Sequence, residues 1–465
     1  MQPGRSPKSV KLGSGSGYWG DALEPAIEMA ARADVSYMGF DHLSELTMAI
    51  LSRSKAKDPA QGYIPDLVPW MRALLPVAVP KGIKLITNAG GANPRSAATA
   101  VAKLARELGM PTLRIGIVEG DDVMGQLPKL REQGWTFTNV DTGEQGLDRI
   151  RDRIVAANAY LGSDGIIAQL AAGADVVITG RVSDNALYVA PIMHELAWTF
   201  APEYTDRIAA AITVGHVIEC AACVTGGMSN MWRLTDPTQE IGFPIAEFFD
   251  TGDAVITKTP NSGGIVNEWT VKEHLLYEIG DPRAYVMPDG VADFTSVKLT
   301  DEGNDRVRLT QMRGAPRPKT AKVCIAYKNG FIGEGMAFFP WPDAYDKAQF
   351  AAKWMRARLE RLGLAAHQIH MDFVGVDMLH GDAAHGHVDA ARNANEIGLR
   401  VAAHTDKPDH AEMIRREITH LWTMGPIGSA IAPPSKVRPV MSLWPTLVPW
   451  EAAPTVHDQI TAGGA

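Results

Sequence analysis

The segment that most constrains the fold spans residues 83–109 and reads IKLITNAGGANPRSAATAVAKLARELG. It opens with a short apolar run typical of a β-strand, and a polar tip with two adjacent glycines follows. Asn93 then predicts the N-cap of a helix, and Pro94 suits the first helical position because its missing N–H would be unpaired there anyway. Apolar residues recur on one helical face until Gly109 stops the helix. A strand, a glycine-bearing tip and a helix together form the unit of a parallel sheet.

This unit recurs through the first half of the chain. The apolar runs that end in hydrogen-bonding or titratable residues are 10–12, 35–40, 83–86, 113–118 and 176–179. Ligands of parallel α/β folds bind at the carboxyl ends of the strands. We therefore predict an α/β domain over residues 1–230, with a mostly parallel sheet, flanking helices and one site shared by the strand tips. Between the last two runs, residues 147–161 and 165–172 are predicted to be helical.

The pattern changes beyond about residue 230. Short alternating runs separated by turn-forming residues indicate antiparallel strands, and residues 343–362 and 411–424 indicate helices. Because 465 residues exceed what one hydrophobic core usually serves, a second domain is expected. We predict a C-terminal α+β domain over residues 231–465 that covers the site.

The composition is that of an ordinary globular protein, with 46% hydrophobic and 21% charged residues. A formal net charge of −8 without a long basic run argues against nucleic acid as the main partner. No run of about 18 apolar residues and no apolar leader segment are present, so we expect a cytoplasmic protein without a membrane association. Three cysteines do not form a disulfide framework. Cys220 and Cys223 are best interpreted as small residues of a helical segment, because no second ligand pair completes a zinc site.

Two tips carry groups suited to acid–base chemistry. Asp41, His42 and Glu45 follow one strand, and paired carboxylates beside an imidazole can tune one group toward a general base near neutral pH. The alternative is that Asp41 caps a helix and Glu45 is solvated in its first turn, where anions are favoured. Arg181 and Asp184 follow another strand. Arginine captures carboxylate or phosphate, although the two side chains could simply bind each other. We predict Asp41, His42, Glu45 and Asp184 as catalytic groups.

Glycines and amides at the tips are candidates for binding a substrate anion, because backbone N–H groups at a helix N-terminus favour negative charge. The predicted substrate-binding residues are Gly15, Gly17, Asn88, Gly91, Asn93, Arg181, Lys258 and Asn261. Gly15, Gly17 and Gly20 also match the Gly-x-Gly-x-x-Gly dinucleotide fingerprint, with Asp41 placed to bind a ribose. A nicotinamide-dependent oxidoreductase is therefore an alternative, but we expect neither nicotinamide nor flavin.

Two further acidic or histidine-rich segments could hold a metal. Asp121 and Asp122, together with Glu119, offer hard oxygen ligands for a divalent cation, and a solvated turn is the competing interpretation. His385 and His387 lie in a histidine- and aspartate-rich segment that also resembles an ordinary polar surface loop.

Motifs along nearly the whole chain resemble the acyclic terpene utilisation protein A family. They include VKLGSGSGYWGD, FDHLSELTMAIL, LITNAGGANP, ITGRVSDNAL, GHVIECAACVTGG, TKTPNSGGIV and LLYEIGDPRAYVMPD. The resemblance implies a part in the degradation of branched acyclic terpenoid acids. It also implies a small ferredoxin-like domain at the end of longer members, which we expect to be absent here or supplied by a partner subunit.

The residues and the resemblance together favour a catabolic enzyme that acts on a carboxylic acid or acyl-CoA by proton transfer. Such a reaction would be that of a hydratase, dehydratase, isomerase or related lyase. The alternative from another class is a non-catalytic ligand-binding or scaffold subunit that needs a small partner protein. We further expect a homo-oligomer.

Overall fold

The computed structural model describes residues 7–464, apart from the side chains of residues 385–389. The side chains of His385 and His387 from the histidine-rich segment therefore lie outside the described residues. The chain forms two compact units. Unit 1 runs up to Ala326 and resumes at Leu443, and unit 2 comprises Tyr327–Ser442. No helix of the described residues has the length and apolar character needed to cross a bilayer.

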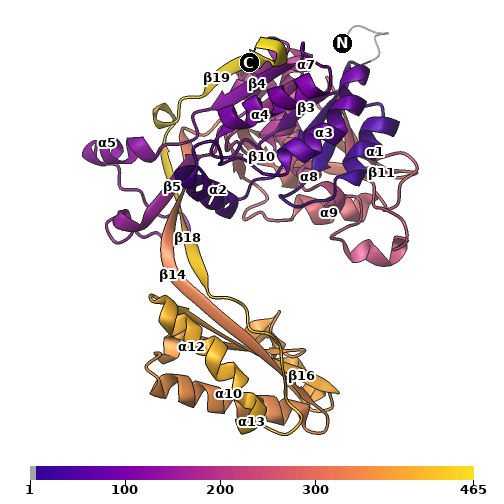
Figure 1. The fold of residues 1–465 in the computed structure, drawn as a ribbon. Helices are drawn as coiled ribbons and strands as arrows, with labels where there is room; N and C mark the ends of the chain where they lie inside the picture. Colours follow the sequence, from indigo (N-terminus) through magenta and orange to yellow (C-terminus); the bar gives the residue numbers. More distant parts are fainter. Residues whose placement is uncertain (1–6, 465) are drawn as a thin grey trace. The chain divides into compact units, whose positions relative to one another are not determined.

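Unit 1 is built on a ten-stranded mixed sheet in the order β11-β12-β8-β7-β1-β2-β3-β6-β4-β19 (Figure 1). Its centre consists of the strands that the sequence predicts, and neighbouring strands there are parallel. These strands are β1 (Ser9–Ser16), β2 (Tyr37–Phe40), β3 (Lys84–Thr87), β6 (Val176–Thr179) and β4 (Arg114–Glu119). The predicted parallel sheet is confirmed, and the α/β class with it.

Helices cover both faces of this sheet. Helices α1 (Glu24–Arg32), α3 (Leu67–Ala78) and α4 (Pro94–Glu107) share one apolar core with strands β2 and β3. Helix α7 (Ala186–Leu196) packs on β1 and β2 from the other face, beside α6 (Asp164–Ala171) and α8 (Thr205–Glu219). Gly39 makes this close approach possible, because a Cβ there would lie 2.5 Å from the ring of Tyr188.

The predicted boundary at residue 230 falls within unit 1. Strands β7 (Pro244–Phe249), β8 (Ala254–Lys258), β12 (Arg306–Thr310) and β11 (Lys298–Gly303) extend the sheet beyond β1. At the other edge, β19 (Val456–Thr461) pairs antiparallel with β4. The alternating pattern of this region correctly indicates antiparallel strands. The partner of β7 is a strand more than 200 residues earlier in the chain, with Ser9 opposite Phe249, and no local pattern reveals that pairing.

The helix predicted over residues 147–161 is wrong. The segment contains a short 3-10 turn and strand β5 (Ile154–Ala159), which pairs with β14. A short apolar run fits a buried helix and a buried strand equally well by its periodicity. The long-range partner decides, since the N–H of Tyr160 donates to the carbonyl of Lys322 at 2.9 Å. The next predicted helix is confirmed as α6.

Unit 2 has the β-α-β-β-α-β order of ferredoxin-like folds, with strands arranged β15-β16-β14-β17. Its elements are β14 (Thr320–Pro340, which begins in unit 1), α10 (Ala344–Arg361), β15 (Ile369–Val374), β16 (Glu396–Thr405), α12 (Pro408–Thr419), α13 (Leu421–Met424) and β17 (Ala430–Ile431). The helices predicted over residues 343–362 and 411–424 are confirmed as α10 and as α12 with α13. Strand β18 (Arg438–Pro449) pairs with β14, and both strands have residues in each unit (Figure 1).

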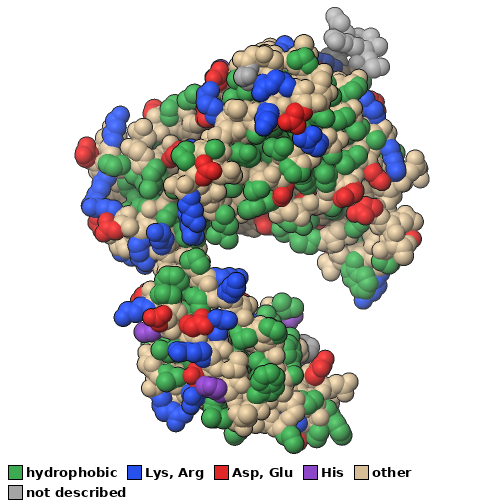
Figure 2. All heavy atoms as spheres, viewed as in Figure 1, with side chains coloured by type: hydrophobic (Ala, Val, Ile, Leu, Met, Phe, Trp, Pro, Cys, Tyr) green, Lys and Arg blue, Asp and Glu red, His purple; other side chains and the backbone are tan. Residues whose placement is uncertain are grey.

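Acidic and basic side chains are interspersed on the visible face of unit 1 (Figure 2). This mixture agrees with the modest net charge of −8. Large single-sign patches are the electrostatic signature of nucleic-acid binding, and the face shown in Figure 2 does not have that character.

Candidate functional site

A cavity of about 680 Å³ lies in unit 1 beside the carboxyl ends of the parallel strands. Predicted site residues from three tips line it: Gly17 after β1; Asp41, His42 and Glu45 after β2; and Arg181 and Asp184 after β6. Since β1, β2 and β6 point the same way in one sheet, the topology brings these tips together. The other walls come from residues far apart in the chain, namely Tyr160, His216, Glu219, Tyr285, Lys322, Leu447 and Trp450.

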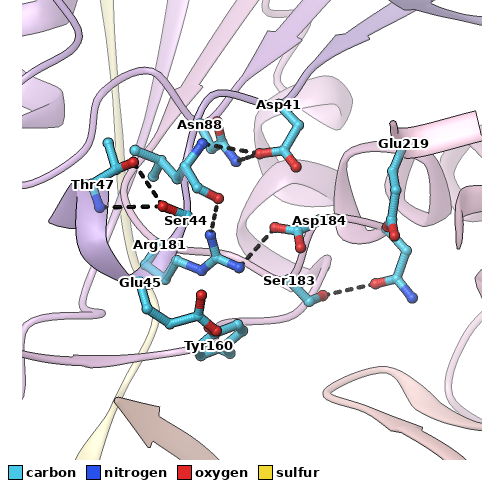
Figure 3. Close-up of polar contacts among 12 residues, drawn as sticks. Asp41, Ser44, Glu45, Thr47, Asn88, Tyr160, Arg181, Ser183, Asp184 and Glu219 are labelled. Atoms are coloured by element: carbon cyan, nitrogen blue, oxygen red, sulfur yellow. Dashed lines mark hydrogen bonds and ion pairs between the residues drawn. The ribbon is translucent and has the colours of Figure 1, made fainter. Parts of the chain in front are cut away.

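Arg181 is the central cation of the cavity and is only 2% exposed. Its guanidinium donates to the carbonyl of Leu43 at 2.5 Å and to Oδ1 of Asp184 at 2.7 Å, as Figure 3 shows. The guanidinium carbon also lies 4.2 Å from the centre of the Tyr160 ring. Burial by itself lowers the pKa of Arg181, but the acidic groups around it, led by Asp184, raise the pKa above its usual value. Arg181 is therefore a fixed positive charge.

Asp41 is held rigidly at the end of β2 and is 5% exposed. Its Oδ1 accepts hydrogen bonds from the N–H of Leu43 at 3.1 Å and from Nδ2 of Asn88. Burial raises the pKa of Asp41 well above its usual value, and the nearby Asp184 raises it further, against the influence of Arg181. These surroundings therefore favour the protonated form of Asp41.

Asp184 and Glu45 are two further carboxyl groups beside Arg181. Burial raises the pKa of Asp184, and the charge of Arg181 counteracts part of that rise. Glu45 behaves in the opposite way: although its burial raises the pKa, the hydrogen bond from Tyr160 and the charges of Arg181 and Lys322 lower it to about 2. One cavity therefore holds carboxyl groups of contrasting protonation, an arrangement common to acid–base sites.

The local structure bears on the alternative interpretation, in which Asp41 caps a helix and Glu45 is solvated. Ser44 is the N-cap of α2 (Glu45–Lys57), and its hydroxyl accepts from the N–H of Thr47 at 3.3 Å. Asp41 is therefore not the cap. Glu45 does lie in the first turn of the helix, but its carboxylate is bonded to Tyr160 rather than only solvated.

His42, predicted as a catalytic group, lines the cavity. Its backbone N–H donates to Oδ1 of Asn88 at 2.8 Å, and its ring packs edge-on against Trp70 with centroids 5.2 Å apart. Burial lowers the pKa of His42 to about 4, so the ring is neutral at pH 7. Its Nδ1 has no hydrogen-bond partner among the described residues.

With this geometry in view, the comparison with protein families is informative. Residues 10–458 match the family model described as acyclic terpene utilisation family protein AtuA. The chain belongs to the AtuA family. Membership implies a role in acyclic terpene utilisation, and the match extends over sequence from both units. A search of curated proteins and a search of solved structures each found no match.

Several predicted binding residues of this AtuA family member lie outside the cavity lining. A Cβ at Gly15 would lie 2.2 Å from the ring of Phe40, so this glycine serves strand packing. Gly91 has a left-handed φ of 53° and packs against Leu51. Asn88 supports the cavity from behind through Asp41.

Asn93, Lys258 and Asn261 also have other partners. The Asn93 side chain caps α4 and donates to the carbonyls of Pro59 and Gln61 at 2.8 and 2.7 Å. Lys258 donates to the carbonyl of Ser262 at 2.7 Å, and Asn261 occupies a left-handed turn with φ of 57°. None of the three lines the 680 Å³ cavity.

In the glycine fingerprint of this AtuA chain, Gly17 packs closely against the end of α8 and its backbone N–H is already bonded. Gly17 lies against the backbone of Cys220, 2.8 Å from where its Cβ would be. The N–H of Gly17 donates to the Asp21 carboxylate at 2.8 Å. The backbone donor that would approach a dinucleotide phosphate is therefore already bonded within the protein.

The two predicted metal ligands lie beside the cavity rather than in it. Asp121 accepts from Asn158 at 2.8 Å, and burial raises its pKa to about 6. Asp122 is exposed and accepts from the N–H of Met124 at 3.0 Å. Among the described residues, no three His, Cys, Asp or Glu side chains group in a way that could hold a metal ion.

The sequence prediction did not include Tyr160, Lys322, Glu219 and His216 among the site residues of this AtuA protein. Tyr160 directly follows strand β5 in the segment predicted as a helix, and Lys322 comes from the region assigned to the second domain. A signal for the others was available, because His216 and Glu219 are three residues apart in the mostly apolar second half of α8.

Proposed function

We propose that this protein is an enzyme of acyclic terpene utilisation that transfers protons on a branched carboxylic acid or its thioester, as a hydratase, dehydratase or isomerase does. One observation carries this proposal. Asp41 and Asp184, whose pKa values are both raised, lie beside the buried cation Arg181 in one cavity.

The two aspartates differ in a way that suits a base and an acid. Asp184 contacts Arg181 directly at 2.7 Å, so it is the one of the pair that ionises first. Asp41 has no such contact, and burial raises its pKa well above the usual value. Asp184 would therefore accept a proton from the substrate, while Asp41 donates one to the oxygen at the acid end of the substrate. Arg181 would stabilise negative charge that develops on a substrate oxygen.

The remaining walls suit a hydrocarbon chain. Tyr18, Val286, Leu447 and Trp450 also line the cavity. Binding sites for small molecules commonly combine such an apolar lining with a few placed polar groups. A branched acyl chain with one polar end has the matching character.

The variant Asp41→Asn tests this proposal. The probe is 3-methylbut-2-enoate in deuterium oxide, and NMR follows the incorporation of deuterium. We expect the exchange rate to fall by about two to four orders of magnitude, the usual loss when a general acid–base group is removed. Asn can keep the hydrogen bond from Leu43, so the melting temperature should stay close to that of the wild type. Asp34→Asn, on an exposed residue, is the control. Unchanged exchange in Asp41→Asn would contradict the proposal.

A further inference from the structure

A further carboxyl group belongs to the wall that α8 contributes to the cavity. Glu219 is the last residue of α8, lines the cavity and is 5% exposed. Its Oε1 lies 3.0 Å from Nδ1 of His216, one helical turn earlier. In the view of Figure 3, Asp184 lies between Arg181 and Glu219.

Glu219 has an oxygen atom without a protein partner. Its Oε2 is buried and accepts no hydrogen bond from any described residue. Buried polar atoms are nearly always paired in native proteins, so such an atom at a cavity wall indicates pairing with a ligand or water. Nε of Arg181, Nδ1 of His42 and Nε2 of His216 are also without a partner among the described residues, and all three residues line the same cavity.

The surroundings disfavour the charged form of both members of this pair. Burial raises the pKa of Glu219 well above its usual value, with further contributions from Asp184 and Glu278 that exceed the opposing effect of Arg181. The negative end of the helix dipole also disfavours a carboxylate at the C-terminus of α8. Burial lowers the pKa of His216 to about 4.

The imidazole of His216 is enclosed by other rings. Its centroid lies 4.9 Å from that of Tyr285, 5.1 Å from that of Phe294 and 5.6 Å from that of His274. This enclosure holds the ring in place, and His216 in turn positions Glu219.

A neutral carboxyl beside a neutral imidazole can arrange its protons in two ways. If Nδ1 of His216 donates, the acid proton is on Oε2 of Glu219, which then donates to a ligand. If Oε1 donates to Nδ1, Oε2 is a carbonyl oxygen and accepts. An alcohol hydroxyl both donates and accepts, so it pairs with Oε2 in either arrangement.

We propose that Glu219, positioned by His216, binds an alcohol hydroxyl, and that the substrate or product of this cavity is a β-hydroxy carboxylic acid or its thioester. This inference rests on the proposed function and names its substrate class. The hydroxyl end would face α8, and Arg181 with Asp41 and Asp184 would face the acid end.

The reaction that follows is a reversible elimination of water. The Asp184 carboxylate takes the proton from the carbon next to the carbonyl group, and the electron pair of that C–H bond becomes the new C=C bond. The C–O bond to the hydroxyl breaks with its electron pair on oxygen. Glu219 supplies the proton that turns the departing hydroxide into water. Solvent then restores the proton to Glu219 and removes one from Asp184.

The binding test compares 3-hydroxy-3-methylbutanoate with 3-methylbutanoate, which lacks the hydroxyl, by titration calorimetry. We expect the wild type to bind the hydroxy acid about 10- to 100-fold more tightly, as expected when a buried polar group finds or lacks its partner. In Glu219→Met the side chain has a similar length but offers the hydroxyl no polar partner. The ratio of the affinities for the two acids should therefore fall to about one. Glu417→Gln, at a buried glutamate of unit 2, should leave the ratio unchanged.

Glu219→Gln provides the second readout and keeps the side-chain shape. It should retain most of the preference for the hydroxy acid but lose about two to four orders of magnitude in dehydration rate, because an amide cannot supply the proton. The inference is overturned if the wild type binds both acids equally or binds neither, if Glu219→Met keeps the preference, or if Glu219→Gln dehydrates at the wild-type rate. A preference that depends on Glu219 without any dehydration by the wild type would instead overturn the proposed function and leave the hydroxyl subsite in place.

Discussion

Glu45 and Asp41 are neighbours in the chain, yet their surroundings shift the two pKa values in opposite directions. Both are withdrawn from solvent, which alone raises a carboxyl pKa. Glu45 gains the Tyr160 hydroxyl and two cations, and its pKa falls to about 2. Asp41 lies near a second carboxyl group, Asp184, and its pKa rises. At the scale of the residue, the acid–base character of the cavity therefore comes from neighbours, not from residue type.

His274 allows a prediction on acid stability. It is 3% exposed, and burial together with the proximity of His216 lowers its pKa from 6.5 to about 3. The neutral ring is favoured in the folded state, so its contribution is complete above pH 6.5 and is lost as the pH falls toward 3. At pH 5 the loss amounts to roughly 2 kcal/mol of unfolding free energy, from about 1.4 kcal/mol per pH unit.

The variant His274→Phe keeps a ring but cannot take up a proton. Its unfolding free energy in urea should therefore decline less between pH 7 and pH 5 than that of the wild type. An equal decline in both proteins would show that His274 does not contribute to acid lability. His404→Phe, at an exposed histidine of unit 2, is the control and should decline as the wild type does.

Among the elements, α4 shows that a sequence pattern can predict the start of a helix correctly without marking a contact to a ligand. Asn93 and Pro94 predict the start of the helix, and the structure begins it there. The Asn93 amide additionally bonds the carbonyls of Pro59 and Gln61, which ties the helix to the loop after α2. Its polar atoms are thus used within the fold.

Asn93→Ala should lower the unfolding free energy by about 1 kcal/mol, the typical cost of losing an N-cap. Binding of 3-hydroxy-3-methylbutanoate should not change, because Asn93 does not line the cavity. Asn93→Asp separates the two roles of the amide, since it retains the cap but cannot donate to Pro59 and Gln61. A loss of affinity larger than the loss of stability would return Asn93 to the list of binding residues.

At the scale of the whole molecule, the chain forms two units with separate cores. Phe339, Met355 and Leu399 belong to the core of unit 2, whereas all residues that line the cavity belong to unit 1. Unit 2 depends on close packing of α12 on its sheet, because a Cβ at Gly335 would lie 2.7 Å from Ile418.

Gly335→Val should destabilise unit 2 by about 1–3 kcal/mol through overpacking. Hydrogen exchange measured by mass spectrometry should accelerate in β16 and α12 and remain slow in β2 and β3. Gly280→Ala, where a Cβ would meet no atom within 4 Å, should leave the exchange pattern as it is. Equal acceleration in both units would mean that they unfold as one cooperative body.

The central parallel strands, their polar tips and the helices that follow could be predicted from the sequence alone. These features depend on periodicity, capping and glycine placement within about 25 residues, as the segment from Ile83 to Gly109 illustrates. The sequence also predicts that Asp41, Glu45, Arg181 and Asp184 lie at one edge of the sheet, because the carboxyl ends of parallel strands meet there. These four residues line the cavity.

Which further residues line the cavity beside these four is visible only in the folded chain. Tyr160 lies directly after β5, Glu219 ends α8 and Lys322 belongs to β14. The pairing of β5 with β14 depends on atoms more than 150 residues apart. The same is true of β7, whose pairing with β1 moves the unit boundary far beyond residue 230. Local patterns carry no information about such partners, because burial and hydrogen bonding between distant segments are properties of the assembled fold.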